Sequence, residues 1–160
     1  MSDDTPSASP SKVAIVVCTR DRPELLQQNV ASIARYRRAH DDVVIVDSAS
    51  RDRSAVPRIA AAAGFRSVRL DLPGASRARN AGVAATTAPL IAFTDDDCLI
   101  TDGWTTGLEE ALSDPAIGFV TGRLIADEES SAATAFAATW PCCNSTIFSE
   151  NYGYAFCRPE

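Results

Sequence analysis

Short apolar runs alternate with helix-like segments along most of the chain, and this alternation limits the possible folds more than any other feature. The first run, residues 12–18 (KVAIVVC), is rich in β-branched side chains and has no alternating polar positions. Such a run is typical of a strand that is buried on both faces of a parallel sheet. Four further segments are expected to be strands: residues 43–46, 65–70, 89–93 and 117–124.

Helices are predicted between these strands. The first begins at Pro23, a residue favoured at the first helical position, and others are expected around residues 57–63, over residues 74–87 and after a cap at Asp102. Apolar residues recur at helical spacing on two of them: Leu26, Val30 and Ile33 on the first, and Trp104, Leu108 and Leu112 on the last. Strand and helix in strict alternation predict an α/β fold with a mostly parallel central sheet.

The composition fits one packed domain. The 160 residues are 46% hydrophobic and 22% charged, which is enough apolar surface for a core. Residues 1–11 carry hardly any apolar side chains and are expected to be a disordered tail. The net charge of −6 argues against a nucleic acid partner, whose phosphates require a basic surface. No segment approaches the ~20 apolar residues that span a bilayer.

The five cysteines have no spacing that fits a zinc site or a disulfide framework. Their number is odd, and Cys142 and Cys143 are adjacent, which is poor geometry for an ordinary disulfide. Free thiols are the rule in reducing compartments, and the polar, acidic N-terminus does not resemble a signal peptide. We therefore expect a cytoplasmic location.

Four polar clusters follow the predicted strands: residues 19–22, 47–52, 74–80 and 94–97. In open α/β sheets, ligands bind outside the carboxyl ends of the strands, so we expect all four clusters to meet at one edge. That edge would carry both arginines and acids. A divalent cation together with an anionic, phosphate-containing ligand would account for both signs of charge.

The acidic run Asp95-Asp96-Asp97 follows an apolar strand. Adjacent carboxylates repel one another, and a hard divalent cation would relieve that repulsion, since Mg²⁺ takes one or two carboxylates plus phosphate oxygens and Mn²⁺ uses similar ligands. The alternative is a solvated acidic turn. Arg77 and Arg79 lie near a predicted helix N-terminus, where backbone N–H groups favour anions; ordinary surface solvation is the alternative for them.

Several well-known motifs are missing. The chain contains neither G-x-G-x-x-G nor G-x-x-x-x-G-K-[ST], which disfavours dinucleotide dehydrogenases and P-loop enzymes. It also lacks G-x-S-x-G, which disfavours an α/β-hydrolase.

The polar clusters and their order along the chain resemble those of the family 2 glycosyltransferases. That family has the GT-A fold, a Rossmann-like three-layer α/β domain. The resemblance covers about residues 13–122. It rests on four stretches in the family's order, namely VVCTRDR (16–22), VDSASRD (46–52), SRARNAG (76–82) and FTDDDC (93–98). Each stretch is weak by itself, and the four together at these spacings are specific.

The resemblance implies a set of site residues. A nucleotide would be bound by Thr19, Arg20, Asp47, Arg77, Arg79, Asn80 and Asp96, with Asp47 holding the base and Arg79 and Asn80 matching the family's R-N-x-G element. Asp95 and Asp97 would form the D-x-D motif, which binds Mg²⁺ or Mn²⁺ bridging the diphosphate, and Asp96 is the alternative ligand. The metal would act as a Lewis acid on the leaving nucleoside diphosphate.

The chain departs from the family pattern in two places. Ser48 stands where many members have a second Asp, so recognition of the base is expected to differ. The resemblance also divides the chain into a nucleotide-sugar-binding core, residues 12–125, and an incomplete start of the acceptor side, residues 126–160, entered by a strand near residues 153–158. No carboxylate matches the family's general base, which is expected to be absent; Glu150 is a candidate substitute.

The expected function is a metal-dependent transfer of a sugar from a nucleotide-diphosphate sugar to an acceptor hydroxyl, with inversion at the anomeric carbon. The alternatives are a truncated, non-catalytic domain that binds the donor, and a nucleotidyltransferase, whose Gly-rich, Lys-containing signature is missing. The acceptor is expected to be a saccharide, a lipid or a small molecule, and peripheral association with a membrane is a separate expectation.

Overall fold

The computed structural model describes residues 13–122 and the backbone of residues 154–157. Its strands are β1 (Val13–Thr19), β2 (Asp42–Asp47), β3 (Arg66–Arg69), β4 (Leu90–Asp95), β5 (Phe119–Thr121) and β6 (Tyr154–Cys157). Its helices are α1 (Pro23–Tyr36), α2 (Ala55–Ala62), α3 (Ala75–Ala84) and α4 (Trp104–Ala111). The predicted tail, residues 1–11, and most of residues 126–160 lie outside the described residues.

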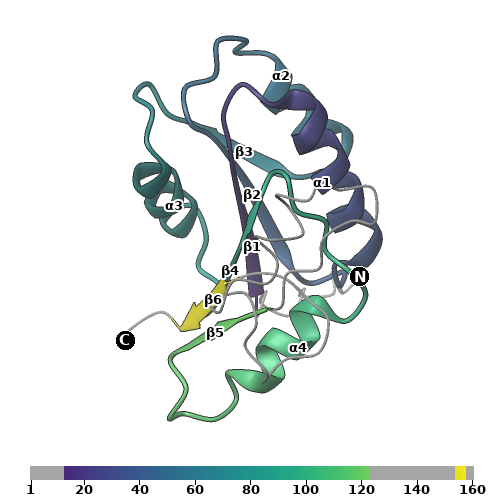
Figure 1. Ribbon diagram of the computed structural model, residues 1–160, viewed down its shortest axis with the longest axis vertical. Helices are drawn as coiled ribbons and strands as arrows, with labels where there is room; N and C mark the ends of the chain where they lie inside the picture. Colours follow the sequence, from purple (N-terminus) through teal and green to yellow (C-terminus); the bar gives the residue numbers. More distant parts are fainter. Residues whose placement is uncertain (1–12, 123–153, 158–160) are drawn as a thin grey trace, which may run out of the picture.

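The strands form one sheet in the order β3-β2-β1-β4-β6-β5. The pairs β3–β2, β2–β1 and β1–β4 are parallel, whereas β6 is antiparallel to both of its neighbours, β4 and β5. Figure 1 shows β6 beside β4, with β5 at the edge. The prediction of a mostly parallel sheet is confirmed, and the strand expected near residues 153–158 is inserted between two strands that precede it in the chain.

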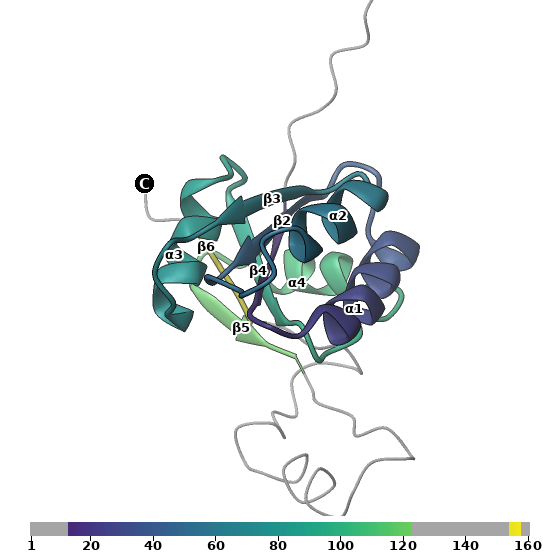
Figure 2. The same ribbon diagram turned by 90° about the horizontal axis from the view of Figure 1, so that it is seen from above.

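Helices cover both faces of the sheet, as Figure 2 shows from above. Val13, Ile15 and Val17 of β1 pack into a cluster with residues of α1, α2 and α4, while the alternate residues Ala14 and Val16 pack with residues of α3. All five side chains are fully buried. Because alternate residues of a strand point to opposite faces, β1 needs apolar residues at every position, and the predicted three-layer α/β fold is confirmed.

The helices begin and end close to their predicted positions, and their predicted apolar faces are buried. Pro23 starts α1 as predicted. Pro57 lies inside α2, which begins at Ala55; a proline is tolerated there because the first-turn N–H groups have no helical acceptor. The expected cap at Asp102 is wrong, since Gly103 precedes α4 in a left-handed conformation (φ +74°) without a side-chain cap.

Two further boundaries differ from the predictions. Helix α3 ends at Ala84 rather than residue 87, because the Thr86 hydroxyl accepts a hydrogen bond from the Ala88 N–H and so competes with the helical pattern. Strand β5 begins only at Phe119, because the Ile117 N–H is already bonded to the Asp114 carbonyl in a turn. Among the described helices, none has the length and apolar character that crossing a membrane requires.

Candidate functional site

The carboxyl ends of β1 and β4 form the point where the sheet reverses its direction of growth. The chain proceeds from β1 outward to β2 and β3, and then returns to β4 on the other side of β1. Crevices for ligands form at such switch points in α/β sheets. Thr19 ends β1 and Asp95 ends β4, so the acidic run lies directly at this crevice.

Hydrogen bonds link the four polar clusters at this edge, as the sequence predicts. Thr19 donates to Asp96 across the switch point, with 2.6 Å between the oxygens. The Asp21 N–H donates to the Ser50 hydroxyl at 3.0 Å, and the Gly74 N–H donates to the Ser48 hydroxyl at 3.0 Å. The loops after β1, β2, β3 and β4 therefore form one connected surface.

The three acidic residues differ in their environment. Asp96 is fully buried, whereas the side chains of Asp95 and Asp97 are 53% and 47% exposed. The Cys98 N–H donates to the Asp95 carbonyl at 3.1 Å, which closes a turn directly after β4. Two carboxylates thus point to solvent on either side of one that points inward.

Burial raises the pKa of Asp96 above its ordinary value. The hydrogen bond from Thr19 and the charge of Arg22 partly oppose this shift, and the charges of Asp97 and Asp95 add to it. Thr19 is itself buried. A carboxyl group that is desolvated next to two like charges is typical of functional sites, and here it forms the inner support of the acidic run.

Two residues of this support are missing from the sequence-based site. Arg22 lies 2.8 Å from the Asp96 carboxylate and 3.1 Å from that of Asp97. Asn29 is fully buried and its amide donates to the carbonyls of Asp95 and Cys98, at 3.1 and 2.6 Å. The signal for Asn29 would have been a polar residue on the otherwise apolar face of α1.

Asp47, the predicted base-binding residue, makes its polar contacts with the loop that follows it and with the neighbouring strand β3. Its carboxylate accepts a hydrogen bond from the Ser50 N–H at 2.8 Å and forms an ion pair with Arg69 of β3. Arg69 also donates to the Ser50 carbonyl at 2.9 Å. The Asp47 side chain is almost fully buried, so the structure shows it fixing the shape of the loop after β2.

Backbone conformation fixes these loops as well. Asp21 and Ala49 both have left-handed backbone conformations, with φ of 55° and 62°, which are uncommon outside glycine and cluster at functional sites. The Asp21 carboxylate accepts a hydrogen bond from the Arg51 N–H at 2.7 Å. Each strained residue thus belongs to a loop that is tied to the other.

The predicted arginines lie around the same edge, mostly toward solvent. Arg79 of α3 is 3.4 Å from the Asp95 carboxylate, and Arg20 is 3.8 Å from Asp21. Arg77 and Asn80 are exposed on α3. The structure brings Thr19, Arg79 and the acidic run together, while the binding roles of all these residues stay predictions.

The oxygen ligands at this edge fit a cation that is shared with a phosphate. Within residues 13–122 and 154–157, no group of three His, Cys, Asp or Glu residues is arranged to hold a metal ion by itself. The exposed carboxylates of Asp95 and Asp97 nevertheless suit Mg²⁺, which commonly binds through one or two carboxylates and completes its shell with water and substrate phosphates. Asp95 and Asp97 could therefore supply the protein ligands of a metal site, with the remaining ligands coming from water and phosphate.

Comparison with known proteins places the chain in a family. The model of glycosyl transferase family 2 matches residues 14–150, which is most of the chain. This chain belongs to that family. No match was found among curated protein sequences.

Solved structures agree with the fold. A mannosyltransferase from Pyrobaculum calidifontis, PcManGT, in complex with GDP-Man and Mn²⁺, superimposes with a TM-score of 0.69 at 24% identity, over 94% of this chain and 45% of that chain. S. aureus TarS 1–349 in complex with UDP-GlcNAc superimposes with a TM-score of 0.64 at 15% identity, over 75% and 36%. The chain thus spans less than half the length of these proteins.

Proposed function

We propose that the chain forms the donor side of a glycosyltransferase and binds a nucleotide-diphosphate sugar together with Mg²⁺ or Mn²⁺. The observation that carries this proposal is the pair of exposed carboxylates, Asp95 and Asp97, around the buried Asp96 at the switch point. Family membership and the nucleotide sugars in the complexes of PcManGT and TarS support it.

Each part of the edge has a role in this proposal. Asp95 and Asp97 would hold the cation, which stabilises the charge that develops on the leaving nucleoside diphosphate. Arg79 would lie beside the diphosphate as a cationic partner. The interlocked loops after β1 and β2 would enclose the nucleoside, their shape maintained by the Asp47–Arg69 ion pair.

The second half of the proposed reaction is attack by an acceptor hydroxyl, with inversion at the anomeric carbon. It requires a general base, and the candidate Glu150 lies outside the described residues. Transfer and donor-hydrolysis assays on this chain separate a complete enzyme from a domain that only binds the donor. The acceptor, a cytoplasmic location and peripheral membrane association stay predictions.

Calorimetric titration with UDP and with GDP, with and without Mn²⁺, tests the donor-binding proposal. We expect one of the two nucleotides to bind with an affinity that depends on Mn²⁺. Asp95→Ala and Asp97→Ala should each weaken Mn²⁺-dependent binding by at least about tenfold, because each removes an ionic ligand that this hard cation prefers.

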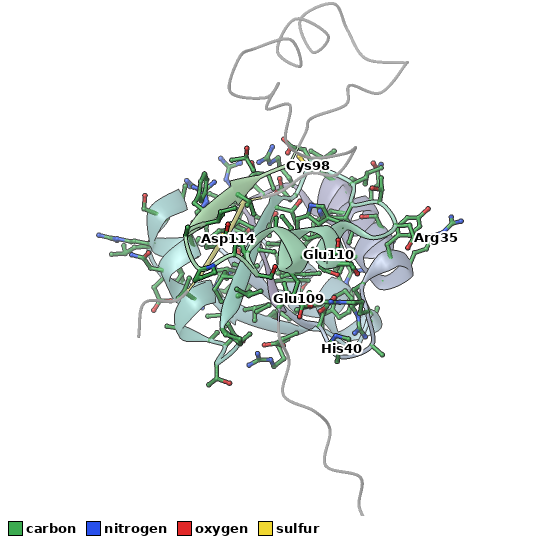
Figure 3. The ribbon with its side chains drawn as sticks, turned by 90° about the horizontal axis from the view of Figure 1, so that it is seen from below. Arg35, His40, Cys98, Glu109, Glu110 and Asp114 are labelled. Atoms are coloured by element: carbon green, nitrogen blue, oxygen red, sulfur yellow. The ribbon has the colours of Figure 1, made fainter. Side chains whose placement is uncertain are left out.

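The matched control is Asp114→Ala. Asp114 is exposed and is well separated in Figure 3 from Cys98, the neighbour of the acidic run. This variant makes the same charge change and should leave nucleotide affinity unchanged. Binding that ignores Mn²⁺, or that survives both substitutions in the acidic run, would place the cation elsewhere and reject the proposal.

A further inference from the structure

Arg22 joins two members of the acidic run. Its Nη2 lies 2.8 Å from Asp96 Oδ1, and its Nη1 donates to Asp97 Oδ2 at 3.1 Å. The residue lies immediately before α1, and its carbonyl accepts the Leu26 N–H at 3.0 Å. The guanidinium is therefore attached to a fixed backbone. Its Nη2 contacts the buried carboxylate of Asp96, and its Nη1 contacts the half-exposed carboxylate of Asp97.

The two contacts of Arg22, with Asp96 and with Asp97, differ in how easily another partner can replace them. Asp96 is buried and supported by Thr19, so breaking its contact with Arg22 would leave a desolvated carboxylate with less compensation. Asp97 is about half exposed, as is Arg22 itself, and water can replace that contact at little cost. The Nη1–Asp97 contact is therefore the more easily broken of the two.

A cation at Asp97 would compete with the Arg22 Nη1 for the Asp97 carboxylate. The proposed metal and the Arg22 Nη1 require the same carboxylate, and their like charges repel each other at close range. With Nη2 still on Asp96, Nη1 would become free beside the cation. The anionic groups that accompany the cation there are the phosphate oxygens of the donor, which a guanidinium binds well.

We propose that Arg22 is an exchangeable counter-cation. In the metal-free protein it neutralises Asp97, and when a divalent cation binds Asp97, the released Nη1 turns to the diphosphate. This inference rests on the proposed function, and it adds a residue that holds the empty site and then positions the donor. It predicts opposite effects on the two ligands: Arg22 weakens the binding of the bare cation and strengthens that of the nucleotide.

The test compares Arg22→Gln with the unaltered protein in two separate titrations. The first uses Mn²⁺ alone, with free Mn²⁺ measured by electron paramagnetic resonance. The second adds UDP or GDP at saturating Mn²⁺. We expect Arg22→Gln to bind Mn²⁺ about five- to tenfold more tightly, because a neighbouring positive charge is gone, and the nucleotide about tenfold more weakly, because a charged hydrogen bond is lost.

Two further variants serve as controls. Arg22→Lys keeps the charge but cannot hold two carboxylates with one planar group, so its Mn²⁺ affinity should lie between those of the other two proteins. Arg35→Gln makes the same charge change in the last turn of α1, far from Cys98 in Figure 3, and should bind both ligands normally. Thermal unfolding of all variants establishes that they are folded.

The possible outcomes separate this inference from the proposed function. Unchanged or weaker Mn²⁺ binding by Arg22→Gln overturns the inference, and weakening of both ligands together would show that Arg22 only supports Asp96. If the unaltered protein binds Mn²⁺ but neither nucleotide, the proposed function fails, and the exchange with the diphosphate fails with it. The Mn²⁺ comparison would then still decide whether Arg22 occupies Asp97.

Discussion

At the scale of single residues, the site is built from side chains of the same type placed in different environments. Asp95, Asp96 and Asp97 have identical chemistry, yet only Asp96 is buried and supported by Thr19. The reason is the turn after β4, closed by the Cys98 N–H and the Asp95 carbonyl, in which Asp96 contacts Thr19 and Arg22. The inner carboxylate stabilises the turn that presents the outer two.

Cys18, the residue before Thr19, provides a test of this environment. Burial raises the pKa of its thiol from 9.0 to about 11; the charge of Arg79 opposes the shift, while those of Asp95 and Asp96 add to it. Because the thiolate is the reactive form, alkylation of Cys18 in the folded protein should keep accelerating through pH 10. In urea the rate should level off above about pH 9.

Iodoacetamide labelling resolved by peptide mass spectrometry measures these rates for Cys18 separately. Cys98, whose pKa burial and the nearby Asp97 and Asp95 raise to about 12, should behave in the same way. Both are free thiols, as the sequence predicts. A native profile for Cys18 that levels off near pH 9 would show that its surroundings do not disfavour the thiolate.

At the scale of elements, the approach of α3 to β1 fixes the distance between the arginines of α3 and the acidic run. Gly82 is buried in this contact, and a Cβ added to it would lie 2.2 Å from Cγ1 of Val16. A glycine inside a helix costs about 1 kcal/mol relative to alanine. A glycine is required at this position because α3 packs too closely against β1 to leave room for a Cβ.

Gly82→Ala should therefore destabilise the fold by about 1–3 kcal/mol despite its better helix propensity. Gly107→Ala is the matched control, because Gly107 lies within α4 and an added Cβ meets nothing within 4 Å. That variant should gain up to about 1 kcal/mol. Urea unfolding measures both free energies, and a change of the same sign in the two variants would contradict the packing argument.

At the scale of the whole molecule, a second polar network lies at the amino end of β2, away from the site. Asp41 is buried, accepts a hydrogen bond from Thr105 of α4 at 2.8 Å and pairs with Arg38 at 2.8 Å. Arg38 also forms an ion pair with Glu109 of α4. This network joins the connection between α1 and β2 to a helix more than sixty residues later.

Asp41→Ala should lower the free energy of unfolding by about 3 kcal/mol, since it leaves Arg38 and Thr105 without their shared partner. Glu109→Ala, which removes a partly exposed partner of the same arginine, should cost less than about 1 kcal/mol. Urea denaturation at neutral pH gives both values. Equal losses in the two variants would mean that the buried carboxylate does not hold the network together.

The sequence by itself determined the layers of the fold and the edge of the sheet at which the candidate site lies. Apolar runs without alternation require a sheet covered on both faces, as β1 shows with Val13 to Val17. Polar residues after successive parallel strands must meet at one edge, because all of those strands point the same way. These inferences needed only local patterns and the periodicity of strand and helix.

Only the tertiary structure decided which side chains meet at that edge. The contacts of Arg22 with Asp96 and Asp97 and of Asn29 with the acidic turn join residues more than sixty positions apart. The placement of β6 between β4 and β5 likewise joins distant segments. Local propensity carries no information about such pairs, because they depend on how α1 packs against the sheet and on which edge of β4 remains open.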